Sequence, residues 1–338
     1  MNAVKPSVAV ESIATVIRAG LVPMIHGSPG TGKSDIVRKV AKEFNLEVID
    51  ERLANCDPTD LKGFPKVNGD VATFIPFDTF PTTDSLIPEG KDGWLLFLDE
   101  LPHAPESVQK AAYKILLDRM VGGRKLHPQV AIVAAGNLES DGAFTSRSST
   151  AMQSRLVHIE LMVNTADWIA HAQEQDYDPR VVSYIQYRPS NLQMFDPDHT
   201  DYTFACPRTW EFASKLLGKM KDVGPSALPL LAGTLGEGAA REFIQFLNVF
   251  EQLPSIQSIE SGPETVNMPY NDGGTLFALS GMLADNVTKS NVNSLMRYVN
   301  RMPREFQVIT IRDMSRRYPL LTQNELFMNK AMELSALI

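Results

Sequence analysis

The stretch GSPGTGKS at residues 27–34 decides the fold, because its spacing G-x-x-x-x-G-K-[ST] is that of a phosphate-binding loop. The short apolar run LVPMIH precedes it at 21–26, and SDIVRKVAKEF follows it with apolar residues at helical spacing. The order strand, loop, helix is the context that this motif requires. A glycine-rich turn without a ligand is the competing interpretation, and the flanking pattern argues against it.

The residue types of this loop suit phosphate binding. Glycines let the backbone curl, so that its N–H groups and the N-terminus of the following helix face an anion. The Lys33 ammonium adds positive charge toward the β and γ phosphates of a nucleotide, and the Ser34 hydroxyl can ligate Mg²⁺. The residues predicted to bind the nucleotide are Gly27, Ser28, Pro29, Gly30, Thr31, Gly32, Lys33 and Ser34.

Four further apolar runs predict the rest of a sheet: LEVI at 46–49, WLLFLDE at 94–100, VAIVAAGN at 130–137 and LVHIELMV at 156–163. Their hydrophobicity is mostly continuous, which is typical of strands buried on both faces. With 21–26, they predict an α/β fold with a five-stranded parallel sheet covered by helices. Between the third and fourth of the five runs, PESVQKAAYKILLDRM has helical spacing and meets the turn Gly122-Gly123, which predicts a short hairpin.

Two strand ends carry polar groups. Asp99 and Glu100 follow a buried run at the carboxyl edge of the sheet, where α/β proteins bind ligands. We expect Asp99 to bind Mg²⁺ and Glu100 to polarise an attacking water, although an ordinary acidic strand end has the same sequence. Asn137 ends the run at 130–137, and it could orient that water if the strands adjoin, or simply form a turn.

After residue 163 the strand-like runs mostly stop and helical patterns replace them, which predicts a second, helical domain. Residues 254–273 are rich in Pro, Gly, Ser and Asn, and this composition is typical of a linker. We therefore expect a nucleotide-binding core at 1–163, a helical domain at 164–253, and a linker with a C-terminal helical region at 254–338.

Composition limits the function classes. The 338 residues are 43 % apolar and 21 % charged, as in ordinary folded proteins, and the net charge of −8 disfavours bulk binding to nucleic acid. Cys56 and Cys206 form no disulfide framework, and the six histidines form no close metal-binding motif. No secretory leader and no apolar stretch of about 18 residues is present, so we expect a cytoplasmic protein without a membrane span.

The motifs GSPGTGKS, LLFLDE, VAAGN and CPRTW, in this order, resemble those of the AAA+ ATPases, specifically the MoxR-like branch. The resemblance covers about residues 10–250. DPTDLKGFPKVNGDVATFIPF resembles the insert before the Walker B strand of that branch, and ELPHAPESVQKAAYKILLDRMVGGRKL its next helix and hairpin. The resemblance implies a P-loop AAA+ core with an α-helical lid, ATP and Mg²⁺ as cofactors, and ATP hydrolysis in a homo-oligomeric ring, commonly a hexamer.

The resemblance also assigns roles to single residues. Asn137 matches sensor 1, Arg155 takes the place of an arginine finger that acts on the neighbouring subunit, and Arg208 matches sensor 2 on the lid. Arg208 follows Pro207, a favoured first helical residue, and a plain surface arginine is its alternative. Arg147 competes with Arg155 for the finger, because Ser154-Arg155-Leu156 departs from the acidic-Arg-Phe pattern of the family.

A second departure follows the Walker B carboxylates, where Leu101-Pro102-His103-Ala104 replaces the usual Asn-Arg pair. The resemblance implies a motor that remodels or activates a partner protein, either a protein substrate or a protein with a von Willebrand factor A domain. The alternative is a nucleotide-gated DNA loader or scaffold of clamp-loader or McrB-like type. The pair Ser154-Arg155 faintly favours this alternative, and the net acidity disfavours it.

Overall fold

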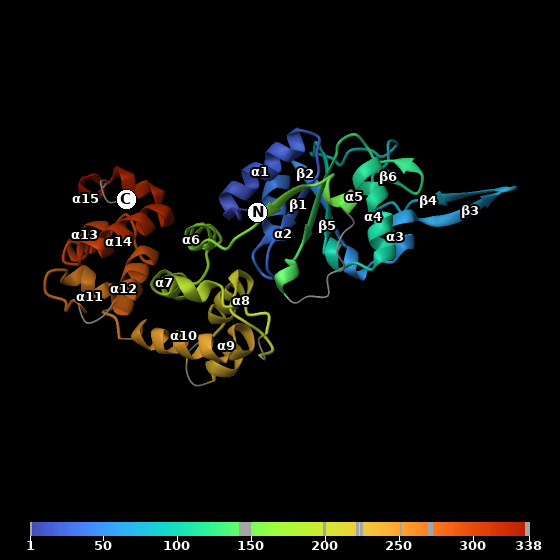
Figure 1. The fold of residues 1–338 in the computed structure, drawn as a ribbon. Coiled ribbons are helices and arrows are strands. Elements are labelled where there is room, and N and C mark those ends of the chain that lie inside the picture. Colours follow the sequence, from blue (N-terminus) through green and yellow to red (C-terminus); the bar gives the residue numbers. More distant parts are fainter. Residues whose placement is uncertain are drawn as a thin grey trace. The chain divides into compact units, whose positions relative to one another are not determined.

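A computed structural model describes residues 2–141, 150–198, 201–220, 223, 226–250, 252–269 and 273–334 (Figure 1). The chain divides into two compact units. The first comprises Met1–Asn164 with Asp196–Asp198, and the second comprises Thr165–Phe195 with His199–Ile338. None of the described helices is both long enough and apolar enough to cross a membrane.

The first unit is built on the predicted five-stranded parallel sheet, which the structure confirms. The strand order is β2-β5-β8-β1-β9, and every neighbouring pair is parallel. Six of the seven residues of β5 are buried, as the continuous apolar run predicts. The strands are β1 (Pro23–His26), β2 (Leu46–Arg52), β5 (Gly93–Asp99), β8 (Val130–Gly136) and β9 (Val157–Glu160).

Each face of the sheet has its own core, because successive side chains of a strand point to opposite faces. Ile25, Phe97 and Val133 pack on one face with the apolar sides of α1 (Pro6–Arg18) and α2 (Lys33–Glu43). On the other face, Met24, Leu96, Leu98, Ile132 and Ala134 pack against α4 (Glu106–Asp118). The sheet is therefore covered on both sides, and its strand ends are fixed by two separate cores.

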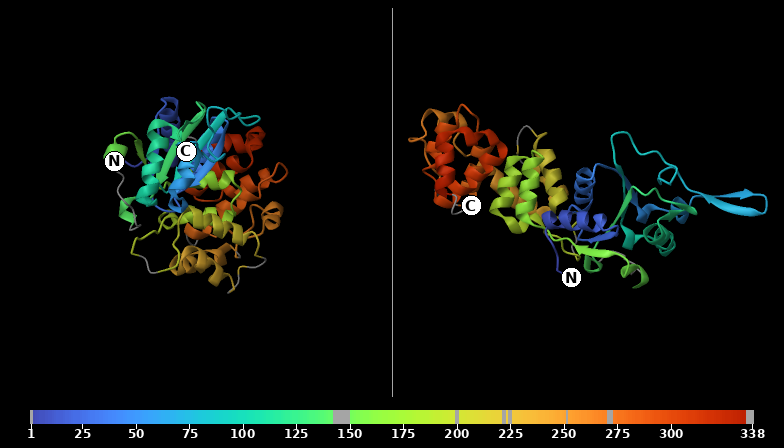
Figure 2. Two further views of the ribbon diagram at one scale, coloured as in Figure 1. Left: turned by 90° about the vertical axis from the view of Figure 1, so that its right-hand side faces the viewer. Right: turned by 90° about the horizontal axis from the view of Figure 1, so that it is seen from above.

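Two hairpins accompany the sheet. The predicted turn at Gly122 and Gly123 joins β6 (Met120–Val121) to β7 (Arg124–Lys125), and both glycines have positive φ, 54° and 83°. The longer hairpin pairs β3 (Phe64–Asn68) with β4 (Val71–Ile75), and Figures 1 and 2 show it extending away from the sheet. All residues of these two strands are exposed. The remaining elements of the unit are η1 (Leu53–Asn55), α3 (Pro58–Lys62), η2 (Leu101–His103), η3 (Glu139–Asp141) and α5 (Thr150–Gln153).

The described secondary structure of the second unit is helical. Trp210, Tyr184 and Phe243 form an aromatic core in its first part, and the Trp210 indole donates a hydrogen bond to the Asn191 carbonyl over 2.9 Å. Its helices up to residue 250 are α6 (Thr165–Glu174), α7 (Pro179–Tyr187), η4 (Pro189–Leu192), α8 (Pro207–Leu217), α9 (Ala227–Leu235) and α10 (Glu237–Phe250).

The stretch 254–273, predicted to be a linker, differs from that expectation. It holds the helix α11 (Ile256–Ser261), whose Ile259 is completely buried, and Met268 is also part of the same core. Ile256 and Val266 also pack against this core, which includes the helices that follow. Those helices are α12 (Gly273–Asp285), α13 (Val292–Val299), α14 (Arg304–Arg317), η5 (Pro319–Gln323) and α15 (Glu325–Leu334).

Candidate functional site

Three predicted motifs follow three neighbouring strands of the sheet. β8 lies between β5 and β1, so Asn137 comes between the carboxylates that end β5 and the glycine-rich loop that follows β1. The carboxyl ends of parallel strands share one edge, and α/β sheets bind ligands there. The strand order therefore brings together residues that are more than a hundred positions apart in the chain.

The backbone of the loop depends on its glycines. Gly30 and Gly32 have φ of 75° and 88°, in the left-handed region that side chains disfavour, and Gly32 is the N-cap of α2. At Gly27 a Cβ would lie 3.2 Å from Thr31 Oγ1 and 3.3 Å from the Leu161 carbonyl oxygen. The loop thus delivers the first turn of α2, whose backbone N–H groups have no partners within the helix, to the edge of the sheet.

Lys33 connects this loop to the next strand. Its side chain is buried, and the ammonium donates to the Gly27 carbonyl over 2.6 Å, to the Ser28 carbonyl over 3.1 Å and to Asn137 Oδ1 over 2.8 Å. A buried ammonium requires such acceptors, because an unpaired charge is costly to bury. Lys33 therefore fixes the two residues that begin the loop relative to the end of β8.

Further hydrogen bonds join the loop to the segment after β8. The Gly27 N–H donates to the Gly136 carbonyl over 3.3 Å, and the Ser28 hydroxyl donates to Asp141 Oδ1 over 3.2 Å. The other carboxylate oxygen of Asp141 accepts from the Leu138 N–H over 3.1 Å. Asp141 is a site residue that the sequence did not reveal, since nothing in its local pattern distinguishes it from other surface aspartates.

Glu100 has an unusual backbone. Its φ of 58° is left-handed, which costs a non-glycine residue about 1–3 kcal/mol and occurs mostly at functional sites. The Glu100 N–H donates to Asp99 Oδ1 over 2.9 Å. Two residues later Pro102 packs on Gly136, where a Cβ would lie 2.3 Å from the proline Cδ. The missing side chain at Gly136 thus lets η2 rest against β8 and fixes the turn that carries Glu100.

Ser34 and Asp99 suit the predicted magnesium ion by their chemistry, since Mg²⁺ prefers oxygen ligands and usually keeps several waters beside one or two carboxylates and phosphates. Both residues are half-buried, Ser34 in the first turn of α2 and Asp99 at the end of β5. The part of the chain that the structure describes contains no cluster of three or more His, Cys, Asp or Glu that could hold a metal ion. Phosphates and waters would therefore have to supply the remaining ligands.

The predicted arginines are carried by other elements. Arg155 is exposed in the turn between α5 and β9, in the first unit. Arg208 is exposed in the first turn of α8, in the second unit. Arg147 lies outside the described residues. The structure thus gathers the loop 27–34, the carboxylates 99–100 and Asn137, and the roles of the arginines stay predictions.

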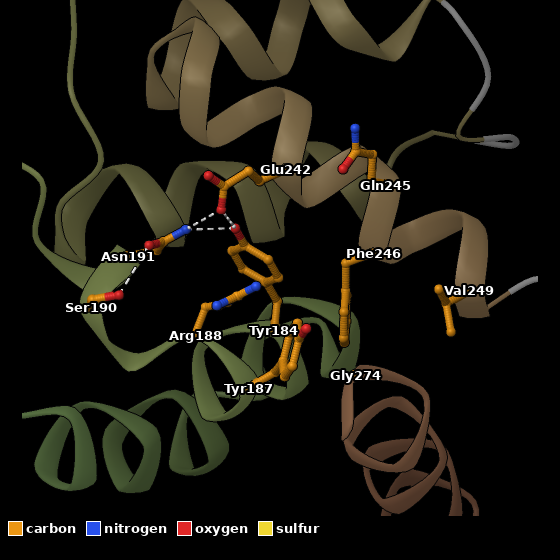
Figure 3. Close-up of a pocket in the computed structure, with 10 residues that line it drawn as sticks. All are labelled: Tyr184, Tyr187, Arg188, Ser190, Asn191, Glu242, Gln245, Phe246, Val249 and Gly274. Carbon is orange, nitrogen blue, oxygen red and sulfur yellow. Dashed lines mark hydrogen bonds between the residues drawn. The ribbon is translucent and has the colours of Figure 1, made fainter. Parts of the chain in front are cut away.

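The second unit contains a cavity of about 570 Å³ that no sequence motif predicted (Figure 3). Figure 3 shows Tyr184, Asn191 and Glu242 pointing toward one another, and the Asn191 amide donates to Tyr184 Oη over 2.7 Å and to Glu242 Oε2 over 3.0 Å. Burial raises the pKa of the Tyr184 hydroxyl. The described lining includes no glycine-rich loop, so the cavity lacks the phosphate-binding backbone of the first unit. The lining residues are Tyr184, Tyr187, Arg188, Ser190, Asn191, Glu242, Gln245, Phe246, Val249 and Gly274.

Comparison with known proteins identifies the first unit. Residues 23–156 match the family model of the AAA domain, dynein-related subfamily, and this match contains every motif at the sheet edge. The first unit contains an AAA domain of the AAA+ ATPases. The family predicted from the sequence is thereby confirmed, and an AAA domain implies that this AAA+ protein binds ATP.

Solved structures align with most of this AAA+ protein, at low sequence identity and low TM-score. A provisionally assigned ATPase of Cytophaga hutchinsonii is 14 % identical, with a TM-score of 0.37, over 98 % of this chain and 90 % of that one. The RuvB Holliday junction branch migration motor of Thermotoga maritima is 16 % identical, with a TM-score of 0.38, over 88 % of this chain and 85 % of that one. None of the curated proteins compared with the chain matches it.

Substitution of Lys33 tests the site. Lys33→Ala removes the ammonium that faces the loop, so ATP affinity measured by calorimetry should fall at least tenfold, about 1.4 kcal/mol. The variant should still fold, with a loss of about 1–3 kcal/mol in unfolding free energy, because removal of the Lys33 side chain leaves three acceptors without this donor. Lys39→Ala, on the exposed side of the same helix, should change neither quantity. Unchanged ATP affinity in Lys33→Ala would exclude the loop as the nucleotide site.

Proposed function

We propose that this AAA+ protein is an ATP-hydrolysing ring motor that uses turnover to remodel or activate a partner protein. The observation that carries the proposal is the arrangement at the sheet edge. Lys33 of the loop bonds to Asn137 over 2.8 Å, and the half-buried Glu100 follows the strand next to that of Asn137. Phosphoryl transfer needs mostly positioning and charge stabilisation, and these groups can supply both.

Binding of ATP would use the loop and the start of α2. Backbone N–H groups of residues 28 and 30–34 would surround the phosphates. The Lys33 ammonium would exchange neutral carbonyl acceptors for phosphate oxygens, which form stronger charge-assisted hydrogen bonds. Ser34 and Asp99 would hold Mg²⁺, which when bound neutralises the negative charge of the phosphates. The existing bonds of Lys33 keep the ammonium in place before the nucleotide arrives.

Hydrolysis would depend on the two side chains that follow β5 and β8, Glu100 and Asn137. Glu100 would polarise the attacking water as a general base, and the left-handed backbone with Pro102 seated on Gly136 holds this carboxylate at the end of β5. Asn137 would orient the same water through its amide, since its Oδ1 already lies at the Lys33 ammonium. A strained, well-supported turn is a reasonable device for this role because it limits the positions of Glu100.

The remaining charges would come from arginines. We propose that Arg155, exposed after α5, acts on the nucleotide of the neighbouring subunit of a homo-oligomeric ring, most simply a hexamer. Arg208 would contact the nucleotide as sensor 2 from the first turn of α8. Arg147 stays the alternative for the finger.

Mixing two inactive variants tests the trans-acting role. Glu100→Gln should bind ATP normally and lose at least about 100-fold in turnover, because an amide is a poor general base. Arg155→Ala should lose about 10³–10⁵-fold. A mixture of the two contains sites that combine an intact Glu100 with a neighbour's intact Arg155, so the steady-state ATPase rate should partly recover.

The control for this experiment is Arg147→Ala. Recovery in a mixture of Arg147→Ala with Glu100→Gln, together with normal turnover of Arg155→Ala alone, would transfer the finger to Arg147. If Glu100→Gln alone turned over ATP within about threefold of the unmodified protein, a difference of roughly 0.7 kcal/mol, Glu100 would not be the catalytic carboxylate.

A protein partner is supported by the exposed hairpin. Phe64, Val67 and Val71 are each more than 60 % exposed, and Phe74 and Ile75 are more than 40 % exposed. Isolated apolar residues are common on surfaces, but a group of this kind on one projecting element marks a contact with another protein. The hairpin strands carry one lysine, Lys66, and no arginine, so they lack the basic character that a DNA loader would need at such an element.

Val67→Asp tests this role of the hairpin. Basal ATP hydrolysis should be unchanged, while stimulation by the protein encoded beside it, such as one with a von Willebrand factor A domain, should fall at least tenfold, because a charge would enter an apolar contact. Asn68→Asp adds the same charge to an exposed polar position and should keep the stimulation. Stimulation by DNA that weakens with salt, and that survives Val67→Asp, would favour the DNA-loader alternative.

A further inference from the structure

Two half-buried histidines meet beside the nucleotide loop. His26 is the last residue of β1, immediately before Gly27, and His158 lies on the neighbouring strand β9, with its Cα opposite Met24. His26 Nε2 and His158 Nδ1 are 2.8 Å apart, and the two rings stack with centroids 5.1 Å apart. None of the motifs includes either residue, so the pair is a feature of the fold that the site described above leaves unused.

The protons of this pair follow from the partners of His158. Its Nε2 lies 2.8 Å from the Gln153 carbonyl oxygen, which can only accept a hydrogen bond. His158 Nε2 must therefore carry a proton, and in the neutral ring Nδ1 is then an acceptor for the His26 Nε2–H. The result is a directed chain in which His26 donates to His158 and His158 donates to Gln153.

This chain of hydrogen bonds ends at the segment that carries Arg155. Gln153 is the last residue of α5, a helix of four residues, and the next turn is held by the Arg155 N–H bond to the Met152 carbonyl over 3.0 Å. So short a helix has little stability of its own, and the carbonyls of its last turn need outside partners. His158 supplies such a partner to the carbonyl of Gln153, and Gln153 lies two residues before Arg155.

The other end of this chain of hydrogen bonds, His26, adjoins the nucleotide loop. Gly27, the residue after His26, accepts a hydrogen bond from Lys33 through its carbonyl and donates one through its N–H to Gly136. A displacement of the loop by bound phosphates would therefore act on His26 directly through the backbone. The hydrogen-bonded chain thus has the subunit's own nucleotide site at one end and the turn of its exposed arginine at the other.

We propose that His158, oriented by His26, is a positioning residue that fixes the α5–β9 turn and so presents Arg155 to the site of the neighbouring subunit. This inference rests on the proposed function, in which Arg155 acts in trans. It goes further because it says what holds Arg155 in place: the pair of His26 and His158, which adjoins the nucleotide loop of the same subunit.

Complementation separates this role from a role in the subunit's own site. His158→Ala should lower kcat for ATP at least tenfold and change KM less than about twofold, since the phosphate-binding loop of the same subunit stays intact. Mixed with Glu100→Gln, it should recover activity, because the Glu100→Gln subunit still presents an intact Arg155. Mixed with Arg155→Ala, it should not recover, since both subunits then lack a well-placed finger.

The opposite pattern, recovery with Arg155→Ala and none with Glu100→Gln, would overturn the inference and assign His158 to its own subunit's site. If Glu100→Gln and Arg155→Ala failed to recover activity in their own mixture, the trans-acting role of Arg155 would fail, and the inference with it. The two failures are therefore distinguishable in one set of mixtures.

A matched pair of substitutions separates hydrogen bonding from packing. The Gln side chain carries an amide N–H to about the place of His158 Nε2, whereas the Asn amide ends near the place of Nδ1. His158→Gln should keep kcat within about threefold of the unmodified protein, and His158→Asn should lose as much as His158→Ala. Equal rates for the Gln and Asn variants, at equal melting temperatures, would show that the bond to Gln153 does not position Arg155.

Discussion

The bonds of the Lys33 ammonium hold the proposed nucleotide site together. They join the carbonyls of Gly27 and Ser28, at the start of the loop, to the side chain of Asn137, at the end of a different strand. A buried ammonium that lost these acceptors would have to be solvated or neutralised, so the loop and β8 are fixed in one arrangement before a nucleotide binds. The same ammonium is the group best suited to receive phosphate, and support and binding therefore depend on one side chain.

Packing supplies the second constraint on the site. Pro102 can lie over β8 only because Gly136 has no side chain, and this contact holds the turn in which Glu100 takes its left-handed conformation. In this chain Leu101-Pro102-His103-Ala104 stands where related proteins carry an Asn-Arg pair. The turn that carries Glu100, the proposed catalytic carboxylate, is therefore supported by an apolar contact inside the subunit.

The sequence predicted the parts of the fold that depend on local pattern. Continuous apolar runs identified the buried strands, and the spacing of Gly27, Gly32 and Lys33 identified the loop. It could not reveal the contacts of His26 with His158 or of Ser28 with Asp141, because these depend on which strands become neighbours. The β3–β4 hairpin has no buried face and so no alternation to detect, and Ile259 shows that a polar stretch can hold a docked helix.

The central claim is that three neighbouring strand ends form the nucleotide site of this AAA+ protein, and a crystal structure with ADP and Mg²⁺ bound tests it most directly. The account predicts phosphates against the backbone N–H groups of residues 28 and 30–34, with the Lys33 ammonium bonded to a phosphate oxygen. Phosphates bound elsewhere, for example in the cavity beside Tyr184, with Lys33 still bonded to the carbonyl of Gly27, would contradict it.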